Sequence, residues 1–108
     1  MLAPLFGNEN ASRVLLYIAN YGDGYAAGIA RTFGVPLYAV QRQLLRLEQG
    51  GIVASTMVGR TRLYRINPRY PLRKELTALL DRALRYLPEE ETKRHYRQRR
   101  RPIQPGKR

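Results

Sequence analysis

The chain has no cysteine and only one histidine, His95, among its 108 residues. The lack of cysteine excludes a disulfide scaffold, a thiolate zinc site and a cysteine nucleophile. One histidine is too few for a histidine-built metal site or a catalytic triad. The few carboxylates are scattered along the chain, apart from the run at Glu89–Glu91. We therefore expect no enzymatic activity, no metal and no cofactor.

Long apolar runs are also missing from the sequence. No apolar stretch reaches the roughly 18 residues that a membrane span needs. The N-terminal segment MLAPLFGNENAS has no basic region, and its apolar stretch is too short for a signal peptide. The length leaves room for one domain and a tail, which rules out a large multidomain enzyme. We expect a soluble, cytoplasmic protein.

Negative charge is scarce, and the excess of positive charge is unevenly distributed. The formal net charge is +12, of which residues 1–92 carry only +4. Residues 93–108 contain no acidic residue and hold the basic side chains Lys93, Arg94, Arg97, Arg99, Arg100, Arg101, Lys107 and Arg108. This pattern predicts a folded domain over residues 1–87, followed at 88–108 by a basic helix and tail. A polyanion is the expected partner of the tail.

Three helices are predicted in the first half of the chain. Apolar spacing and an Asn cap favour a helix over 8–20, and a second helix is expected over 26–33. Gly34 is expected to end the second helix in the left-handed conformation. Pro36 then begins a third helix that runs to about Gln49.

The second half predicts a hairpin and two further helices. Residues 52–66 are rich in strand-forming types around a turn at Gly59-Arg60, which indicates a two-stranded hairpin. A fourth helix opens at Pro71, and a fifth is expected over 88–101. The predicted fold is mainly α with a small β-hairpin (α+β).

The spacing of small and apolar residues around the third helix is the most informative motif. Ala30 allows a close helix crossing, and Gly34 allows a turn too tight for a β-carbon. Val40, Leu44 and Leu47 would anchor the third helix to the first two. Its opposite face carries Tyr38, Gln41, Arg42, Leu45 and Arg46. Cations, an amide and an aromatic ring on one free helix face suit a DNA major groove.

Two segments, IARTFGVPLYAVQRQLLRLEQGGIV and GRTRLYRIN, resemble winged helix-turn-helix transcriptional regulators of the ArsR-like and MarR-like groups. The resemblance implies a recognition helix with DNA contacts and a hairpin wing that reaches the flanking groove or backbone. The recognition-helix contacts would come from Leu37, Tyr38, Gln41, Arg42 and Arg46, and the wing contacts from Arg60, Thr61 and Arg62. The segment NPRYPLRKELTALL resembles the subset associated with small nucleotidyltransferases.

The sequence departs from that pattern at two positions and in one property. Pro36 stands where the family usually has a Ser cap, so no capping oxygen is supplied. Leu45 occupies a position that is usually polar, and it could pack on the wing, meet a thymine methyl or join a protein contact. The cysteine and histidine clusters of the ArsR metal sensors are absent, so metal sensing is not implied.

A homodimer is the preferred assembly, because two-fold proteins read two half-sites and double their contacts. The candidate interface residues are aromatic or apolar: Tyr17, Tyr21, Leu76, Leu79, Leu80 and Leu84. The sequence therefore predicts a sequence-preferring double-stranded DNA-binding protein, a transcriptional regulator. Two alternatives stay open. One is a protein-interaction module that docks a partner such as a nucleotidyltransferase, and the other is an RNA-binding or nucleoid-structuring protein driven by its tail.

Overall fold

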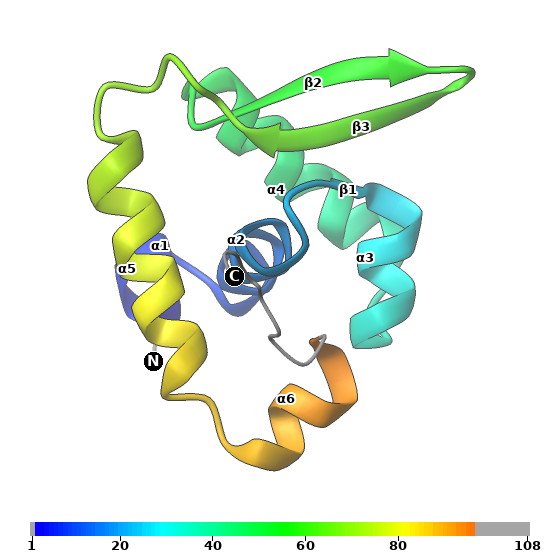
Figure 1. The fold of residues 1–108 in the computed structure, drawn as a ribbon. Coiled ribbons are helices and arrows are strands. Elements are labelled where there is room, and N and C mark those ends of the chain that lie inside the picture. The colour runs from blue at the N-terminus through cyan, green and yellow to red at the C-terminus, as the bar shows by residue number, and fades with distance from the viewer. Residues whose placement is uncertain (1, 97–108) are drawn as a thin grey trace, which may run out of the picture.

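The computed structural model describes residues 2–96 as a bundle of helices around one core, with a small antiparallel sheet on one side (Figure 1). The elements in chain order are α1 (Ala3–Phe6), α2 (Glu9–Tyr21), β1 (Gly24–Tyr25), α3 (Ala26–Phe33), α4 (Leu37–Gln49), β2 (Val53–Val58), β3 (Thr61–Ile66), α5 (Arg73–Arg85) and α6 (Glu89–His95). The predicted α+β class, mainly helical with a hairpin, is confirmed.

Helix α2 is the centre of the bundle, and the other helices lie around it (Figure 1). It begins where the sequence predicts, because the Asn8 side chain accepts a hydrogen bond of 2.7 Å from the Ala11 N–H. Its apolar residues Val14, Leu15 and Ile18 are fully buried. Leu80 of α5 and Ile29 of α3 belong to the same core cluster. Burial of this α2 face is what joins the helices into one domain.

Helices α3 and α4 form the predicted helix-turn-helix unit. Gly34 ends α3 with φ 66° and ψ 35°, the left-handed conformation that glycine adopts most easily. Pro36 caps α4 with extended backbone and offers no side-chain hydrogen bond, as the sequence indicates. The three predicted anchors of α4, Val40, Leu44 and Leu47, are all buried. They fix one face of α4 against the bundle and leave the other face outward.

The sheet has three strands in the order β1-β3-β2, one more than the predicted hairpin. In the hairpin, β2 and β3 pair antiparallel from Val53↔Ile66 out to Val58↔Thr61. The additional strand β1 is only two residues long and pairs with the middle of β3. A β-carbon at Gly24 would lie 2.7 Å from the Tyr17 ring, so this crossing requires glycine.

The C-terminal part corrects one prediction about the helices. Helix α6 ends at His95, because Tyr96 has extended backbone (φ −128°, ψ 150°) and its side chain is buried in the core. A continuous helix from Pro88 to Arg101 is therefore wrong at Tyr96. Tyr96 belongs to the same core cluster as α2, so the end of α6 packs against the domain expected over residues 1–87. No helix within residues 2–96 is long and apolar enough to cross a membrane.

Candidate nucleic-acid interface

The outward face of α4 presents the mixture of side chains that the sequence predicts. Leu37, Tyr38, Gln41 and Arg42 are all exposed, and the Tyr38 side chain keeps 60% of its accessible surface. The Arg42 guanidinium lies over the Tyr38 ring, 5.6 Å from its centroid. Such a cation–π contact orders both side chains without removing the charge from solvent. The pair also lines a hollow of about 500 Å³ between α4 and the start of α2.

Arg46, the fifth predicted contact on α4, is already engaged inside the molecule. Its Nη2 donates to the Phe6 carbonyl at 2.9 Å, and its Nε donates to the Gln43 side chain at 3.0 Å. Arg46 therefore ties α1 to α4, a role the sequence did not suggest because α1 itself was not predicted. Leu45 is 55% exposed, so most of this apolar side chain faces solvent.

The three predicted wing residues, Arg60, Thr61 and Arg62, lie together at the exposed end of the hairpin. Arg62 is fixed by a short chain of hydrogen bonds. Its Nη1 donates to Ser55 Oγ at 3.1 Å, and Ser55 Oγ donates to Glu48 Oε2 at 2.7 Å. Glu48 is on α4, so this chain of hydrogen bonds joins the hairpin directly to α4.

Glu48 and Ser55 are positioning residues that the sequence reasoning missed. Their contact depends on the register of the hairpin, and the sequence did not determine that register. Partial burial, reinforced by the Glu48 carboxylate, raises the pKa of the nearby Tyr64 hydroxyl above its usual range, and Arg62 partly offsets this. The Tyr64 ring is partly buried and packs against the core.

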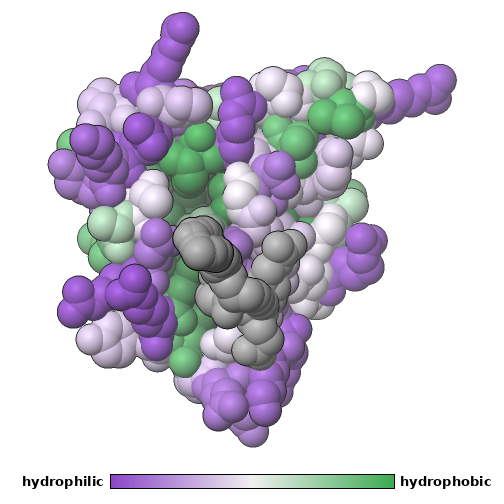
Figure 2. Space-filling model, viewed as in Figure 1, coloured by the Kyte–Doolittle hydropathy of each residue, from purple (hydrophilic) through white to green (hydrophobic). Residues whose placement is uncertain are grey.

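The hairpin extends past the helices as an arm along one side of the molecule (Figure 1). Its surface combines apolar side chains with a hydrophilic side chain that projects beyond the tip (Figure 2). The exposed apolar residues of β2 are Met57 and Val58. No residue from Ile52 to Pro71 is acidic, so the whole arm is positively charged.

The predicted basic tail is only partly within the described residues. Lys93 and Arg94 are on α6, which lies at the opposite end of the molecule from the hairpin (Figure 1). Lys93 forms an exposed ion pair of 3.6 Å with Glu89. The structure thus brings α4 and the wing together but does not place these two cations beside the wing. Arg97, Arg99, Arg100 and Arg101 lie outside the described residues.

The predicted dimer residues do not share one exposed surface. Leu80 is fully buried in the core of its own chain, so its assignment to a dimer interface is wrong. Tyr17 and Tyr21 pack on each other with ring centroids 4.4 Å apart, and the Tyr21 hydroxyl donates to the His95 carbonyl at 3.1 Å. Leu76 and Leu84 are partly buried against the core, whereas Leu79 is exposed.

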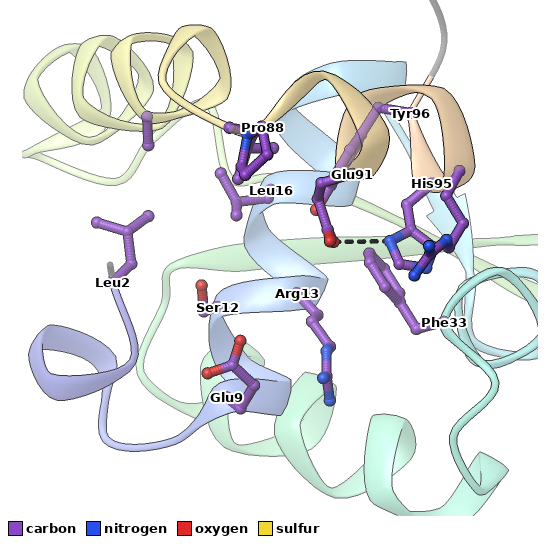
Figure 3. A pocket seen from close by; sticks show the side chains of 13 residues that line it. Leu2, Glu9, Ser12, Arg13, Leu16, Phe33, Pro88, Glu91, His95 and Tyr96 are labelled. Carbon is purple, nitrogen blue, oxygen red and sulfur yellow. Dashed lines mark hydrogen bonds and ion pairs between the residues drawn. The ribbon is translucent and has the colours of Figure 1, made fainter.

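His95 belongs to a packed cluster between α2, α3 and α6, beside a pocket of about 560 Å³ (Figure 3). Its Nδ1 is 2.7 Å from Glu91 Oε2, and its ring packs at a tilt of 47° against Phe33, with the ring centroids 4.8 Å apart. The Arg13 guanidinium approaches the same Phe33 ring at 5.9 Å. His95 therefore has a structural role where α6 meets α3. Within residues 2–96, no three His, Cys, Asp or Glu side chains are grouped for a metal ion.

Several solved bacterial proteins have a similar fold. The chain aligns over 82% of its length with 70% of the YusO protein of Bacillus subtilis, at 24% identity and a TM-score of 0.57. It aligns over 85% of its length with 71% of a MarR-family transcriptional regulator from Rhodococcus sp. RHA1, at 23% identity and a TM-score of 0.56.

The adhesin competence repressor AdcR of Streptococcus pyogenes is similar over 80% of this chain and 72% of its own, at 13% identity and a TM-score of 0.56. No protein-family profile and no curated protein matches the chain. At these identities the likeness establishes the winged-helix fold, and function must be argued from the site itself.

Proposed function

We propose that the chain is a sequence-preferring double-stranded DNA-binding protein that regulates transcription. The observation that carries this proposal is the outward face of α4, where Tyr38 and Arg42 stack in the open beside a basic wing. Similar solved structures include a transcriptional regulator and a repressor, which supports the same function. Helix α4 would enter the major groove, and the wing would lie on the flanking groove or backbone.

The side chains on α4 suit different parts of a base-pair edge. Arg42 has the forked donors that pair with guanine, and Gln41 has the amide that pairs with adenine. Tyr38 holds the Arg42 guanidinium in place and adds a flat apolar surface. Leu37 and Leu45 are available for thymine methyl groups. Arg46 uses Nε and Nη2 in hydrogen bonds within the chain, so we assign its remaining nitrogen, Nη1, to a phosphate rather than to a base.

The cations of the wing and of the tail would add affinity without choosing the sequence. Arg60, Thr61 and Arg62 are at the tip of an arm with no acidic residue. Each phosphate that a cation neutralises releases counterions and steepens the salt dependence of binding. We propose that Lys93, Arg94 and the four arginines of residues 97–101 act in this way, on phosphates away from the segment that the wing contacts.

We also propose that the chain binds DNA as a homodimer and that α5 provides the interface. Leu72, Leu79 and Tyr86 are all exposed, and they recur at a spacing of seven residues. This spacing places them along one side of α5. The stripe replaces the inward-facing Leu80 as the expected seam. The alternative occupant of this stripe is a protein partner such as a nucleotidyltransferase.

The test measures binding of the full chain to a panel of duplexes by fluorescence anisotropy, at several salt concentrations. The variant replaces Arg97, Arg99, Arg100 and Arg101 with Gln, which leaves the buried Tyr96 in place. We expect weaker binding to every duplex and a salt slope that is smaller by up to about four units. The preference of the wild type for one duplex over others should survive.

The control for the tail variant is Arg85→Gln, which removes an exposed cation from α5 and should leave both affinity and salt slope nearly unchanged. A wild-type chain that binds all duplexes equally, or that binds single-stranded RNA more tightly than duplex DNA, would contradict the proposal. Either result would favour a nucleoid-structuring or RNA-binding protein.

A further inference from the structure

The end of the wing exposes two apolar side chains where a solvent-exposed hairpin normally carries polar ones. Met57 keeps 54% of its accessible surface and Val58 keeps 48%. Burial along β2 decreases from the buried Val53 at its base to these exposed residues at its tip. No contact with the core therefore explains why they are apolar, because the tip extends beyond the core.

The strand register places these two side chains on opposite faces of the arm. Met57 pairs with Arg62, and Val58 pairs with Thr61. Cross-strand partners share a face, and neighbours along a strand alternate. Met57 is therefore on the same face as Ser55 and Arg62, and the hydrogen bonds to Glu48 show that this face is turned toward α4.

Charge around the tip indicates the chemistry of the partner. Arg60 and Arg62 flank the two apolar residues, and the arm carries no acid. A partner that matches this surface is polyanionic and has an apolar interior within reach of a methionine side chain. The minor groove of duplex DNA has both properties, since phosphates line its rims and sugar and base surfaces line its walls.

We propose that Met57 enters the minor groove beside the α4 contact and opens a base step, so that the bound duplex is bent. This inference rests on the proposed DNA-binding function and adds a shape-reading contact to it. Methionine is long, unbranched and flexible, and it is among the apolar side chains that proteins insert between base steps. Arg60 and Arg62 hold the groove rims, and the Glu48–Ser55–Arg62 chain keeps the wing at a fixed position relative to α4. Because a bent duplex is favoured at deformable base steps, Met57 would select sequence at positions that α4 does not touch.

The test uses the full chain and a short duplex that the wild type prefers, labelled with a donor and an acceptor dye at its two ends. Energy transfer between the dyes reports the bend, and anisotropy on the same duplex reports affinity. The wild type should bend the duplex by about 20–90°. Met57→Gln, which keeps the length but removes the apolar end, should abolish most of the bend and weaken binding by roughly tenfold.

Two controls separate insertion from general hydrophobicity. Met57→Leu keeps an apolar end and should retain the bend. Leu5→Gln removes a more exposed apolar residue from α1, 64% accessible, and should change neither bend nor affinity. A flexible base step or a nick placed under the wing should restore the affinity of Met57→Gln, because the cost of bending is then lower.

The results distinguish failure of this inference from failure of the proposed function. If the wild type binds its preferred duplex and Met57→Gln bends it equally, Met57 does not insert, while the DNA-binding function stands. If no duplex is preferred, the DNA-binding proposal fails and this inference fails with it. Adsorption to anionic lipid vesicles that depends on Met57, without an effect on DNA, would assign the tip to a membrane surface instead.

Discussion

Phe33 is the residue at which the C-terminal helix meets the helix-turn-helix unit. It is the last residue of α3, immediately before the Gly34 turn that leads into α4. The Arg13 guanidinium, the His95 ring and the Tyr96 ring all lie within 6 Å of the centre of its ring. A change in α6 therefore reaches the turn before α4 through direct packing.

Tyr96 makes this packing sensitive to alkaline pH. Burial raises the pKa of its hydroxyl well above the usual range, and the Glu91 carboxylate acts in the same direction, with Arg13 opposing. As pH rises above about 10, the unfolded chain loses this proton while the folded chain keeps it, so the free energy of unfolding falls. Tyr96→Phe should reduce that fall by about 1.4 kcal/mol per pH unit.

Urea unfolding curves measured from pH 8 to above pH 10 would check this, with Tyr86→Phe as the control because Tyr86 is exposed. The difference between the two variants should appear only at the alkaline end. A wild type and a Tyr96→Phe variant that lose stability in parallel would show that the hydroxyl is not the titrating group.

The elements show which structural features the sequence determines. Helix α3 and the left-handed Gly34 were predicted correctly, because caps and glycines act through the local backbone. Strand β1 was missed because two residues become a strand only when β3 supplies hydrogen bonds from far along the chain. The end of α6 was misplaced because burial of Tyr96 overrides the helical pattern.

Within the candidate site, the exposed face of α4 followed from helical spacing alone. The internal use of Arg46 did not, since its partner is the Phe6 carbonyl of α1, 40 residues earlier in the chain. Likewise, the apolar residues of α5 were predicted, but Leu80 was wrongly assigned to the outward face of this helix. Leucines at four-residue and seven-residue spacings are both present, and only the packing shows that Leu80 points inward.

The exposed stripe on α5 leads to a prediction about assembly. Leu79→Glu places a charge in the middle of the proposed seam without disturbing the core. We expect a dimer of the wild type to become a monomer, measured by light scattering after size-exclusion chromatography, because an unpaired charge at an apolar interface is costly. Lys74→Glu, which changes an exposed residue near the N-terminal end of α5, serves as the control.

If the wild type is a monomer at all concentrations tested, the homodimer proposal is wrong. A wild type that is monomeric alone but binds a protein partner through the Leu79 face would support the interaction-module alternative.

On the scale of the whole molecule, charge and recognition are separated. The net charge is +12, and most of the excess belongs to residues 93–108. The residues proposed to choose the sequence are instead on α4 and at the wing tip, joined by Glu48, Ser55 and Arg62. Affinity and selectivity should therefore respond to different substitutions.

The central claim, that the α4 face selects the DNA sequence, is tested most directly by selecting duplexes from a random pool. The wild type should enrich one motif. Arg42→Ala should enrich the same motif with one base pair relaxed, at a cost of about 1–3 kcal/mol for the original base pair. Enrichment of no motif by the wild type, or an unchanged motif with Arg42→Ala, would contradict the claim.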